Sequence, residues 1–550
     1  MDKFMFRAVV SVAFFVAAAV NLPLARSQTY TPPPHFSHIV IIIQENRTPD
    51  DLFGGDPTAP AATCGGFNGF TPFIDLANGG PNDYNDIAGC SFLTEVPDLN
   101  TGGGTHSNES WQGQWHNGAM DGACNPNTDK GAHCGGTNPP NPPYVYVQQN
   151  VVQPYFDIAN NYGWANYMFQ TNEGPSFPAH QFLFGGTSAP VWPSLEYANY
   201  FVADNPGSAS GCPKSNGNLD WVDPTGDPTF MYPTPNSLMA NLFECYDRNT
   251  MVTTQNGPTG AVTPRTDKSG SAITWKYYAQ SAGTIWDAPE ADPQTCYGLY
   301  QAPMGNPPCS GAEYNHVVFP GTTNGTYAPI FNDIATCNLS KITWVTPDGA
   351  WSDHPGDLGQ KKMGYPGLGP SWVADIVDAI GQSSINSAGA CDYWAVEPTA
   401  IFIVWDDWGG FYDHVPPPFV ARGTDTSCVN HNGSSWGCGY VYGFRVPFLV
   451  VSPYTKAGTV SGPLAAAAKF PPPYPPPPQW THDFGSILNF TEQNFYPATS
   501  RQIAPSPYSY ADGNTFDTTY MGQTVVPLWE FFNSSTILPF TTISAPHAAT

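Results

Sequence analysis

The sequence predicts an α/β fold, in which helices pack on a mostly parallel sheet, and three observations lead to this class. First, four short runs are apolar and rich in β-branched residues, as strands buried on both faces of a parallel sheet are. Second, segments with helical spacing lie between these runs, and strands that alternate with helices are typical of α/β layered folds. Third, the chain of 550 residues is 41% hydrophobic, which suffices for a large core.

The predicted elements are spread along the whole chain. The strongest strand prediction is residues 38–43, HIVIII, and the other predicted strands are residues 341–345, 400–405 and 447–452. The predicted helices are Tyr155 to Met168, Trp372 to Gly381 and Asp483 to Asn494. We expect one domain over residues 30–550, with loop-rich insertions near residues 60–140 and 191–271, where glycine, proline and asparagine are frequent.

The N-terminus has the features of a secretory signal peptide, predicted for residues 1–27. Lys3 and Arg7 precede an apolar stretch from Ala8 to Val20, which is too short to cross a bilayer. We therefore expect a secreted or periplasmic protein without integral membrane association. The twelve cysteines, an even number, then indicate disulfides, whose pairing the spacing leaves open.

The charge of the chain excludes one class of partner. The formal net charge is −26, and a surface of this sign repels the phosphate backbone of nucleic acids. We therefore expect no nucleic-acid partner.

Acidic and amide side chains directly follow two of the predicted strands. Glu45 and Asn46 come after the first, and Asp406 and Asp407 come after the strand at residues 400–405. In open α/β sheets, ligands bind beyond the carboxyl ends of the strands. Clustered carboxylates repel one another, and a divalent metal ion is the usual remedy. A single acid there can instead cap a helix or turn, but two such doublets favour a cation site.

Further blocks of sequence accompany these two acidic segments in a fixed order. The blocks are ENRTPD from Glu45, EGPSFP from Glu173, WVTP from Trp344 with SDHP from Ser352, DDWGGFYDHV from Asp406, GFRVP from Gly443 and HDFGSIL from His482. Together they resemble the bacterial phospholipase C and acid phosphatase (phosphoesterase) family of the alkaline-phosphatase-like superfamily. The blocks cover nearly the whole chain after the predicted signal peptide. The resemblance implies a three-layer sandwich around a mostly parallel central sheet.

The resemblance also implies roles for particular residues. Ser176 would be the nucleophile that attacks phosphorus and forms a phospho-enzyme. One divalent ion would be bound by the two acidic segments, through Glu45, Asn46, Asp406 and Asp407. Oxygen ligands favour Ca²⁺, Mg²⁺ or Mn²⁺, with iron and zinc as further options. Ser176 can also be interpreted as the start of a helix, which is compatible with the catalytic role because a helix N-terminus favours phosphate.

Histidines would donate hydrogen bonds to the phosphate or protonate the leaving oxygen. The resemblance implies this role for His106, His316 and His354. His116 lies nearer than His106 to the segment Met120-Asp121-Gly122, so the choice between these two stays open, with His106 preferred. His180, four residues after Ser176, is expected to pack or to support other residues.

The sequence therefore predicts a secreted, metal-dependent phosphoesterase that acts on a phosphate ester, with phospholipid as one option. Asp407, where many phospholipases of the family have Glu, and Ser176, where many have Thr, favour the acid phosphatase side of the family. Asn46-Arg47-Thr48 is also a glycosylation sequon, and a glycan there would abolish the site, which favours a bacterial source or a buried acceptor. The alternative is a non-catalytic secreted binding protein that retains the fold.

Overall fold

The structure of the chain is a computed structural model. It describes residues 30–54, 93–115, 120, 122–123, 142–188, 201–205, 221–222, 249–255, 261–282, 284–292, 295, 312–319, 328–356, 368–386, 391–413, 415, 417, 442–461, 481–501, 503, 511–520 and 522–547. The predicted signal peptide, His116 and most of both predicted insertions lie outside these residues.

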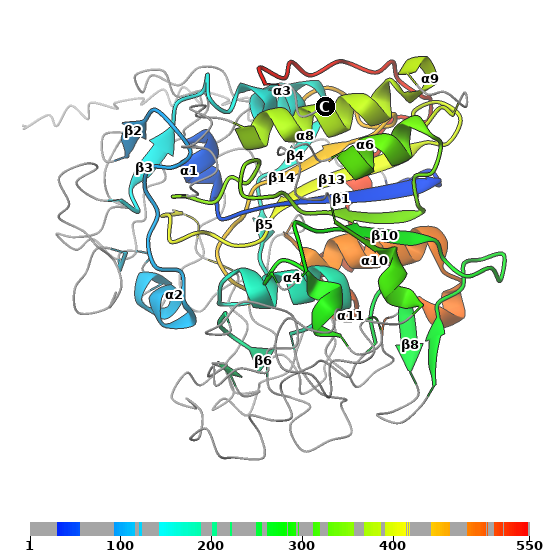
Figure 1. Cartoon of the computed structure of the whole chain (residues 1–550), viewed down its shortest axis with the longest axis horizontal. Coiled ribbons are helices and arrows are strands. Elements are labelled where there is room, and N and C mark those ends of the chain that lie inside the picture. Colours follow the sequence, from blue (N-terminus) through cyan, green and yellow to red (C-terminus); the bar gives the residue numbers. More distant parts are fainter. Residues whose placement is uncertain are drawn as a thin grey trace, which may run out of the picture.

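A sheet of eight strands forms the centre of the molecule (Figure 1). Its spatial order is β11 (Val317–Val318), β10 (Trp275–Tyr278), β12 (Ile342–Val345), β1 (His38–Gln44), β13 (Thr399–Trp405), β14 (Phe448–Val451), β4 (Gly163–Ala165) and β15 (Thr459–Ser461). Only β14 runs antiparallel to its neighbours, β13 and β4. The predicted α/β class with a mostly parallel sheet is therefore confirmed, and so are the four predicted strands.

The two central strands explain the apolar runs in the sequence. β1 and β13 pair in parallel from His38 opposite Thr399 to Gln44 opposite Trp405, and every residue of both strands is buried. Because both strands run in the same direction and end level with each other, the residues that follow them leave the sheet side by side. β14 is equally buried, although it runs antiparallel to β13. An apolar run in the sequence therefore predicts that a strand is buried, but not the direction in which it runs.

Helices lie on both faces of the sheet (Figure 1). On one side are α3 (Gln153–Asn161), α6 (Ala328–Ala335), α8 (Leu368–Gly381) and α9 (Ser383–Asn386). On the other side are α4 (Ser176–Gly185), α10 (Phe484–Phe495) and α11 (Ala511–Asn514). α8 and α10 confirm two predicted helices, and Asp483 caps α10 by accepting the backbone N–H of Ser486.

The third predicted helix, Tyr155 to Met168, is wrong beyond Asn161. α3 ends there, and Gly163–Ala165 forms β4, which fills the gap between β14 and β15. The sheet approaches Gly163 closely, since a Cβ atom there would lie 3.0 Å from the ring of Phe531 and 3.1 Å from the carbonyl oxygen of Thr459. Tertiary pairing therefore overrides the helical spacing of this segment.

Smaller elements complete the described residues. The helices are α1 (Pro49–Phe53) and α2 (Asn108–Trp115), with 3₁₀ turns η3 (Ala288–Ala291), η5 (Glu313–His316), η6 (Ala498–Ser500), η7 (Phe516–Thr518) and η8 (Trp529–Phe531). The short strands are β2 (Thr94–Val96), β3 (Val145–Val147), β5 (Met168–Phe169), β6 (Phe201–Val202), β7 (Trp221–Val222), β8 (Thr253–Gln255), β9 (Val262–Pro264), β16 (His482–Asp483), β17 (Thr519–Tyr520) and β18 (Gln523–Thr524).

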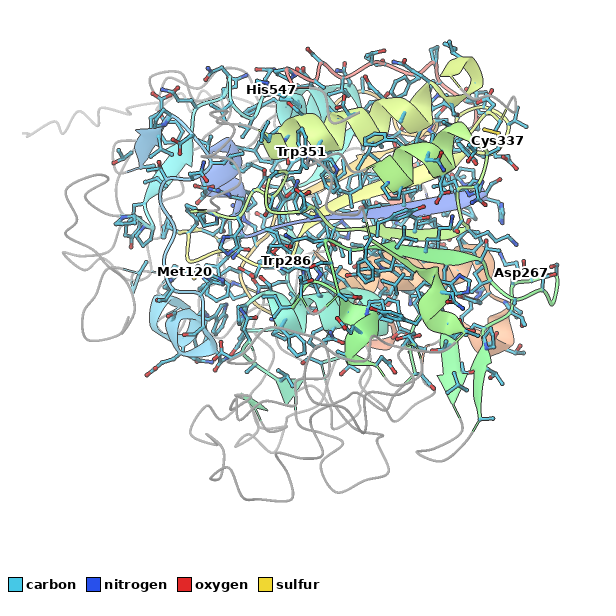
Figure 2. All side chains as sticks on the ribbon, viewed as in Figure 1. Met120, Asp267, Trp286, Cys337, Trp351 and His547 are labelled. Carbon is cyan, nitrogen blue, oxygen red and sulfur yellow. A yellow bond between two sulfur atoms is a disulfide. The ribbon has the colours of Figure 1, made fainter. Side chains whose placement is uncertain are left out.

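A disulfide joins Cys337, which follows α6, to Cys391, which precedes β13 (Figure 2). It spans 54 residues of sequence, so it links two distant segments of the chain. The other ten of the twelve cysteines lie outside the described residues. Among the helices that the structure describes, none has both the length and the apolar character needed to cross a membrane.

Candidate active site

Ser176 lies where α4 meets the carboxyl ends of β1 and β13. It is the first residue of α4, and its side chain is buried. Its hydroxyl donates to Asp407 Oδ2 at 3.0 Å and lies 3.4 Å from Glu45 Oε2. The structure therefore brings together the predicted nucleophile and one carboxylate from each of the two central strands.

Asp406 and Asn46 hold the two strand ends together. Asp406 Oδ1 accepts the backbone N–H groups of Asn46 at 2.8 Å and of Asp407 at 2.7 Å. Asn46 has a left-handed backbone with φ of 60°, which asparagine tolerates better than most residues. Its Nδ2 lies 3.1 Å from His106 Nε2. This arrangement aims the remaining oxygens of both side chains into the site.

These remaining oxygens fit a bound cation. Asn46 Oδ1 and Asp406 Oδ2 are buried, and the described residues offer neither a hydrogen-bond donor within range. A buried acceptor without a partner costs free energy, so such atoms in a native structure point to an ion or water that completes them. Glu45 and Asp407 add carboxylates, and carboxylate and amide oxygens are the ligands of hard divalent cations.

His180 is a site residue that the sequence interpretation missed. Its Nε2 lies 3.1 Å from Glu45 Oε1 and 3.6 Å from Asp406 Oδ2, and the side chain is fully buried. Glu45, His180 and Asp406 form a group whose ligand atoms could hold one metal ion. The signal was present in the sequence, because residues four apart share one face of a helix and Ser176 opens this helix.

Burial and mutual repulsion govern the carboxyl groups of the site. Burial raises the pKa of Glu45 well above its usual range, and the negative charges of Asp406 and Asp407 raise it further. Burial and the charge of Asp406 likewise raise the pKa of Asp407. Burial also acts to raise the pKa of Asp406, but the contacts with His180 outweigh it and lower this pKa. A divalent cation would relieve the repulsion among the three groups.

His106 and His354 lie together on the side of Asn46. Their ring centroids are 6.0 Å apart. His106 Nδ1 lies 3.2 Å from the carbonyl oxygen of Gly104, and His354 Nδ1 lies 2.9 Å from that of Pro355. A carbonyl only accepts, so each Nδ1 carries the proton and each Nε2 faces away from it. Burial lowers the pKa of both rings, and burial together with the nearby His106 lowers that of His354 to about 4.

The structure places His316 elsewhere. Its ring stacks on Trp275 with centroids 4.8 Å apart, and Trp275 is the first residue of β10. Trp275 pairs with Ile342, which pairs with Ile39 near the start of β1. His316 is therefore at the amino end of the sheet, about 17 Å along the strands from the end of β1 at about 3.3 Å per residue.

Gln44 and Arg47 connect β1 to the segment that carries His354. Gln44 Nε2 donates to the carbonyl oxygen of Trp351 at 2.9 Å, and its Oε1 accepts the backbone N–H of Asp353 at 3.0 Å. Arg47 Nε donates to the carbonyl oxygen of Asp353 at 3.0 Å, and its guanidinium lies over the ring of Phe411. Both side chains are buried, so they fix the position of His354 relative to the strand ends.

Comparisons with known proteins identify the family of the chain. A family model described as "Phosphoesterase family" matches residues 36–496. The chain is 21% identical over 480 residues to a non-hemolytic phospholipase C of Pseudomonas aeruginosa, an alignment that covers 83% of this chain and 54% of that protein. It is 30% identical over 173 residues to a non-hemolytic phospholipase C of Burkholderia pseudomallei, covering 30% of this chain and 20% of that protein.

A third relative is matched over more of its own length. Phospholipase C A of Mycobacterium tuberculosis is 23% identical over 451 residues, which cover 79% of this chain and 70% of that protein. The chain thus spans about half or less of the length of the first two relatives, 54% and 20%. The family model covers most of this chain, and its matched region contains both strand ends, Ser176 and the three histidines of the site, His106, His180 and His354. The chain belongs to the phosphoesterase family.

Proposed function

We propose that the chain hydrolyses phosphoric ester bonds, with Ser176 as the nucleophile. The observation that carries the proposal is the position of its hydroxyl, 3.0 Å from Asp407 Oδ2 at the N-terminus of a ten-residue helix. A helix N-terminus favours a phosphate group, and an adjacent carboxylate can take the proton of the serine. The family and the names of its relatives support a phosphate ester as the substrate.

We also propose that one divalent metal ion binds at the strand ends. The residues that would hold it are Glu45, Asn46, Asp406 and Asp407. Support comes from the buried Asn46 Oδ1 and Asp406 Oδ2, neither of which has a hydrogen bond among the described residues. When bound, the ion would neutralise phosphoryl oxygens and lower the pKa of the Ser176 hydroxyl.

The proposed reaction has two steps. Ser176 Oγ attacks phosphorus, its proton passes to Asp407 Oδ2, and the bond between phosphorus and the leaving oxygen breaks. The leaving oxygen takes a proton from Nε2 of the protonated His354 ring, which faces away from Pro355. Water then attacks the phosphorus of the phosphoserine and gives a proton to His354, the bond between phosphorus and Ser176 Oγ breaks, and Asp407 returns its proton to this oxygen as phosphate leaves. In this scheme His106 orients Asn46, and His316 takes no part because it lies at the other end of the sheet.

The relatives leave two substrate classes for this site. A soluble phosphomonoester and a phospholipid both present the phosphoryl group that the scheme requires, and all three compared relatives are named phospholipases C. We further propose an alkaline-phosphatase-like, three-layer arrangement in a single exported domain, supported by helices on both faces of one sheet (Figure 1).

The test is trapping of the phospho-enzyme together with a paired assay. Wild type and Ser176→Ala are mixed with radiolabelled phosphomonoester, quenched in acid and digested, and both are assayed on p-nitrophenyl phosphate and phosphatidylcholine. We expect labelled Ser176 in wild type, and a fall in kcat of at least about a thousandfold in the variant. Unchanged hydrolysis by the variant would exclude Ser176 as nucleophile. A wild type that cleaves neither substrate with any added divalent metal would favour a binding protein.

A further inference from the structure

His180 faces the proposed cation site from the side opposite the strand ends. The oxygen atoms of Glu45 and Asp406 come from β1 and β13, whereas His180 comes from α4, one turn after Ser176. Its side chain is fully buried, so it reaches no solvent. Any partner of its Nε2 must therefore lie within the site.

The separations of the ligand atoms match those around a metal ion. For a metal–ligand distance of about 2.1 Å, neighbouring ligand atoms lie about 3.0 Å apart at octahedral angles and about 3.4 Å apart at tetrahedral angles. His180 Nε2 lies 3.1 Å from Glu45 Oε1 and 3.6 Å from Asp406 Oδ2. A nitrogen and two carboxylate oxygens at these separations fit three corners of one coordination sphere.

The hydrogen bonds behind the ring favour the form of histidine that binds metals. Tyr277 donates its hydroxyl proton to the carbonyl oxygen of Trp286 at 2.8 Å. The same hydroxyl lies 3.4 Å from His180 Nδ1. Because its only proton is already donated to Trp286, the hydroxyl oxygen can only accept a hydrogen bond from this nitrogen. Nδ1 therefore carries a proton, and in the neutral ring Nε2 presents its lone pair to the site. Histidines that bind metals are typically oriented by such a bond from the other ring nitrogen.

We propose that His180 is a nitrogen ligand of the metal ion, so that the site is a mixed nitrogen and oxygen site. The inference rests on the proposed function, because it concerns the same ion. Imidazole suits Zn²⁺, Fe²⁺ and related transition ions, whereas Ca²⁺ and Mg²⁺ are bound almost entirely by oxygen. His180 thus favours a transition ion over Ca²⁺ and Mg²⁺, and Mn²⁺, which oxygen ligands also suit, binds imidazole as well. The competing role is a charged His180 that only donates to the carboxylates.

Pulsed electron paramagnetic resonance of the Mn²⁺-loaded full chain distinguishes these roles. We expect electron spin-echo modulation from a directly bound imidazole nitrogen, which changes when histidine is labelled with ¹⁵N and disappears in His180→Gln. His35→Gln is the matched control, since His35 is exposed and packs against Phe495, and it should keep the signal. A wild-type spectrum without histidine nitrogen coupling would overturn the proposal, and this measurement does not depend on folding of any variant.

Metal affinities give the second readout. In titrations of metal-free protein, His180→Gln should weaken Mn²⁺ and Co²⁺ binding at least about tenfold while changing Ca²⁺ affinity less than about threefold. Tyr277→Phe, which removes the acceptor of Nδ1, should weaken Mn²⁺ binding in the same direction. Equal losses for all ions in His180→Gln would overturn the selective role.

If Mn²⁺ binds through oxygen alone and Ser176 is still labelled, this inference fails and the proposed function stands. Absence of both metal binding and labelling would overturn both.

Discussion

At Gly409 the backbone passes so close to Asn46 that a side chain has no room. Gly409 has a φ of +62°, and a Cβ atom there would lie 2.6 Å from the carbonyl oxygen of Asn46. Its N–H also donates to Asp407 Oδ1 at 2.7 Å. The absence of a side chain at Gly409 therefore allows the segments that follow β1 and β13 to approach each other closely.

We predict that Gly409→Ala weakens divalent-metal binding and kcat/KM by at least about tenfold, because it displaces Asn46. Destabilisation should also reach about 1–3 kcal/mol from backbone strain. Isothermal titration with Mn²⁺ and urea unfolding measure the two effects. Gly522→Ala is the matched control, since Gly522 has a φ of +78° and a Cβ atom there would meet nothing within 4 Å. Equal metal affinity in both variants would contradict the prediction.

The second prediction at this scale concerns His354. Its pKa is lowered to about 4, first by burial and then by His106, so the fraction of the ring able to donate a proton falls as the pH rises above about 4. If His354 is the general acid, kcat/KM for phenyl phosphate should fall with rising pH between about 4 and 7. His354→Asn should be slow and lack this limb.

The leaving group provides the control for His354. p-Nitrophenolate leaves without a proton, so His354→Asn should lose at least about tenfold less activity on p-nitrophenyl phosphate than on phenyl phosphate. Similar losses on both substrates would exclude the general-acid role and leave His354 as a residue that positions the phosphate.

Among the elements, Arg445, which precedes β14, joins that strand to α1 and to the segment after β13. Arg445 Nε donates to Asp413 Oδ1 at 2.9 Å, and its Nη2 donates to Asp413 Oδ2 at 3.0 Å and lies 3.3 Å from Asp50 Oδ1. The side chain is buried, so its charge depends on these partners. Lysine cannot replace arginine in such a bidentate pair, because its single ammonium group cannot donate two parallel hydrogen bonds to one carboxylate.

We therefore predict that Arg445→Lys lowers the free energy of unfolding by about 2–4 kcal/mol, measured by urea unfolding with Mn²⁺ present. Arg501→Lys serves as the control, because Arg501 is half-buried and donates to Gln493, and it should cost less than about 1 kcal/mol. A loss of similar size in both variants would mean that the buried pair is not the cause.

The elements also show what the sequence could and could not predict. The residues of β1 and β13 are mostly apolar because both faces of each strand are covered by the fold. These strands, and the acidic residues that follow them, could therefore be predicted from the local sequence pattern. The segment Tyr155–Met168 could not, because pairing with β14 and β15 decides the state of Gly163–Ala165. The place of His316 depends on which strand β11 pairs with, which local sequence does not encode.

The residues of the candidate site also fall into those that local sequence predicts and those that only tertiary packing brings together. Asn46, Asp406 and Asp407 follow strands directly, so a rule about strand ends suffices to group them. His180 approaches from α4, and only the packing of that helix against the strand ends brings its ring to Glu45. Helical spacing from Ser176 could have suggested its direction, whereas its contact with Tyr277 follows from the sheet order.

On the scale of the whole molecule, His482 joins the C-terminal segment to the core. Its Nδ1 lies 2.6 Å from Asp517 Oδ2, and its Nε2 lies 2.9 Å from Glu530 Oε1. Burial acts to lower the pKa of His482, but the two carboxylates outweigh it and raise this pKa to about 10. The ring is therefore charged at neutral pH, with a partner at each nitrogen.

This cluster predicts a pH dependence of global stability. Because the folded pKa is raised above the unfolded value of about 6.5, the stabilisation is complete below pH 6.5 and is lost as the pH rises through about 10. His482→Gln should unfold about 3–5 kcal/mol more easily at about pH 6, since it removes the positive charge that lies between two buried carboxylates. The difference from wild type should shrink between about pH 7 and 10, as followed by thermal unfolding. A constant difference across this range would contradict the assignment.

The central position of β1 has a consequence for how the chain reaches its native state. Both neighbours of β1, which begin at Ile342 and Thr399, lie some three hundred or more residues after His38 in the sequence. During synthesis, the apolar segment 38–43 therefore has no strand to pair with until most of the chain has emerged from the ribosome. Such long-range pairing folds slowly and exposes a β-prone segment to self-association. The strand that precedes Glu45 and Asn46 is thus also a part of the nascent chain that needs protection from aggregation.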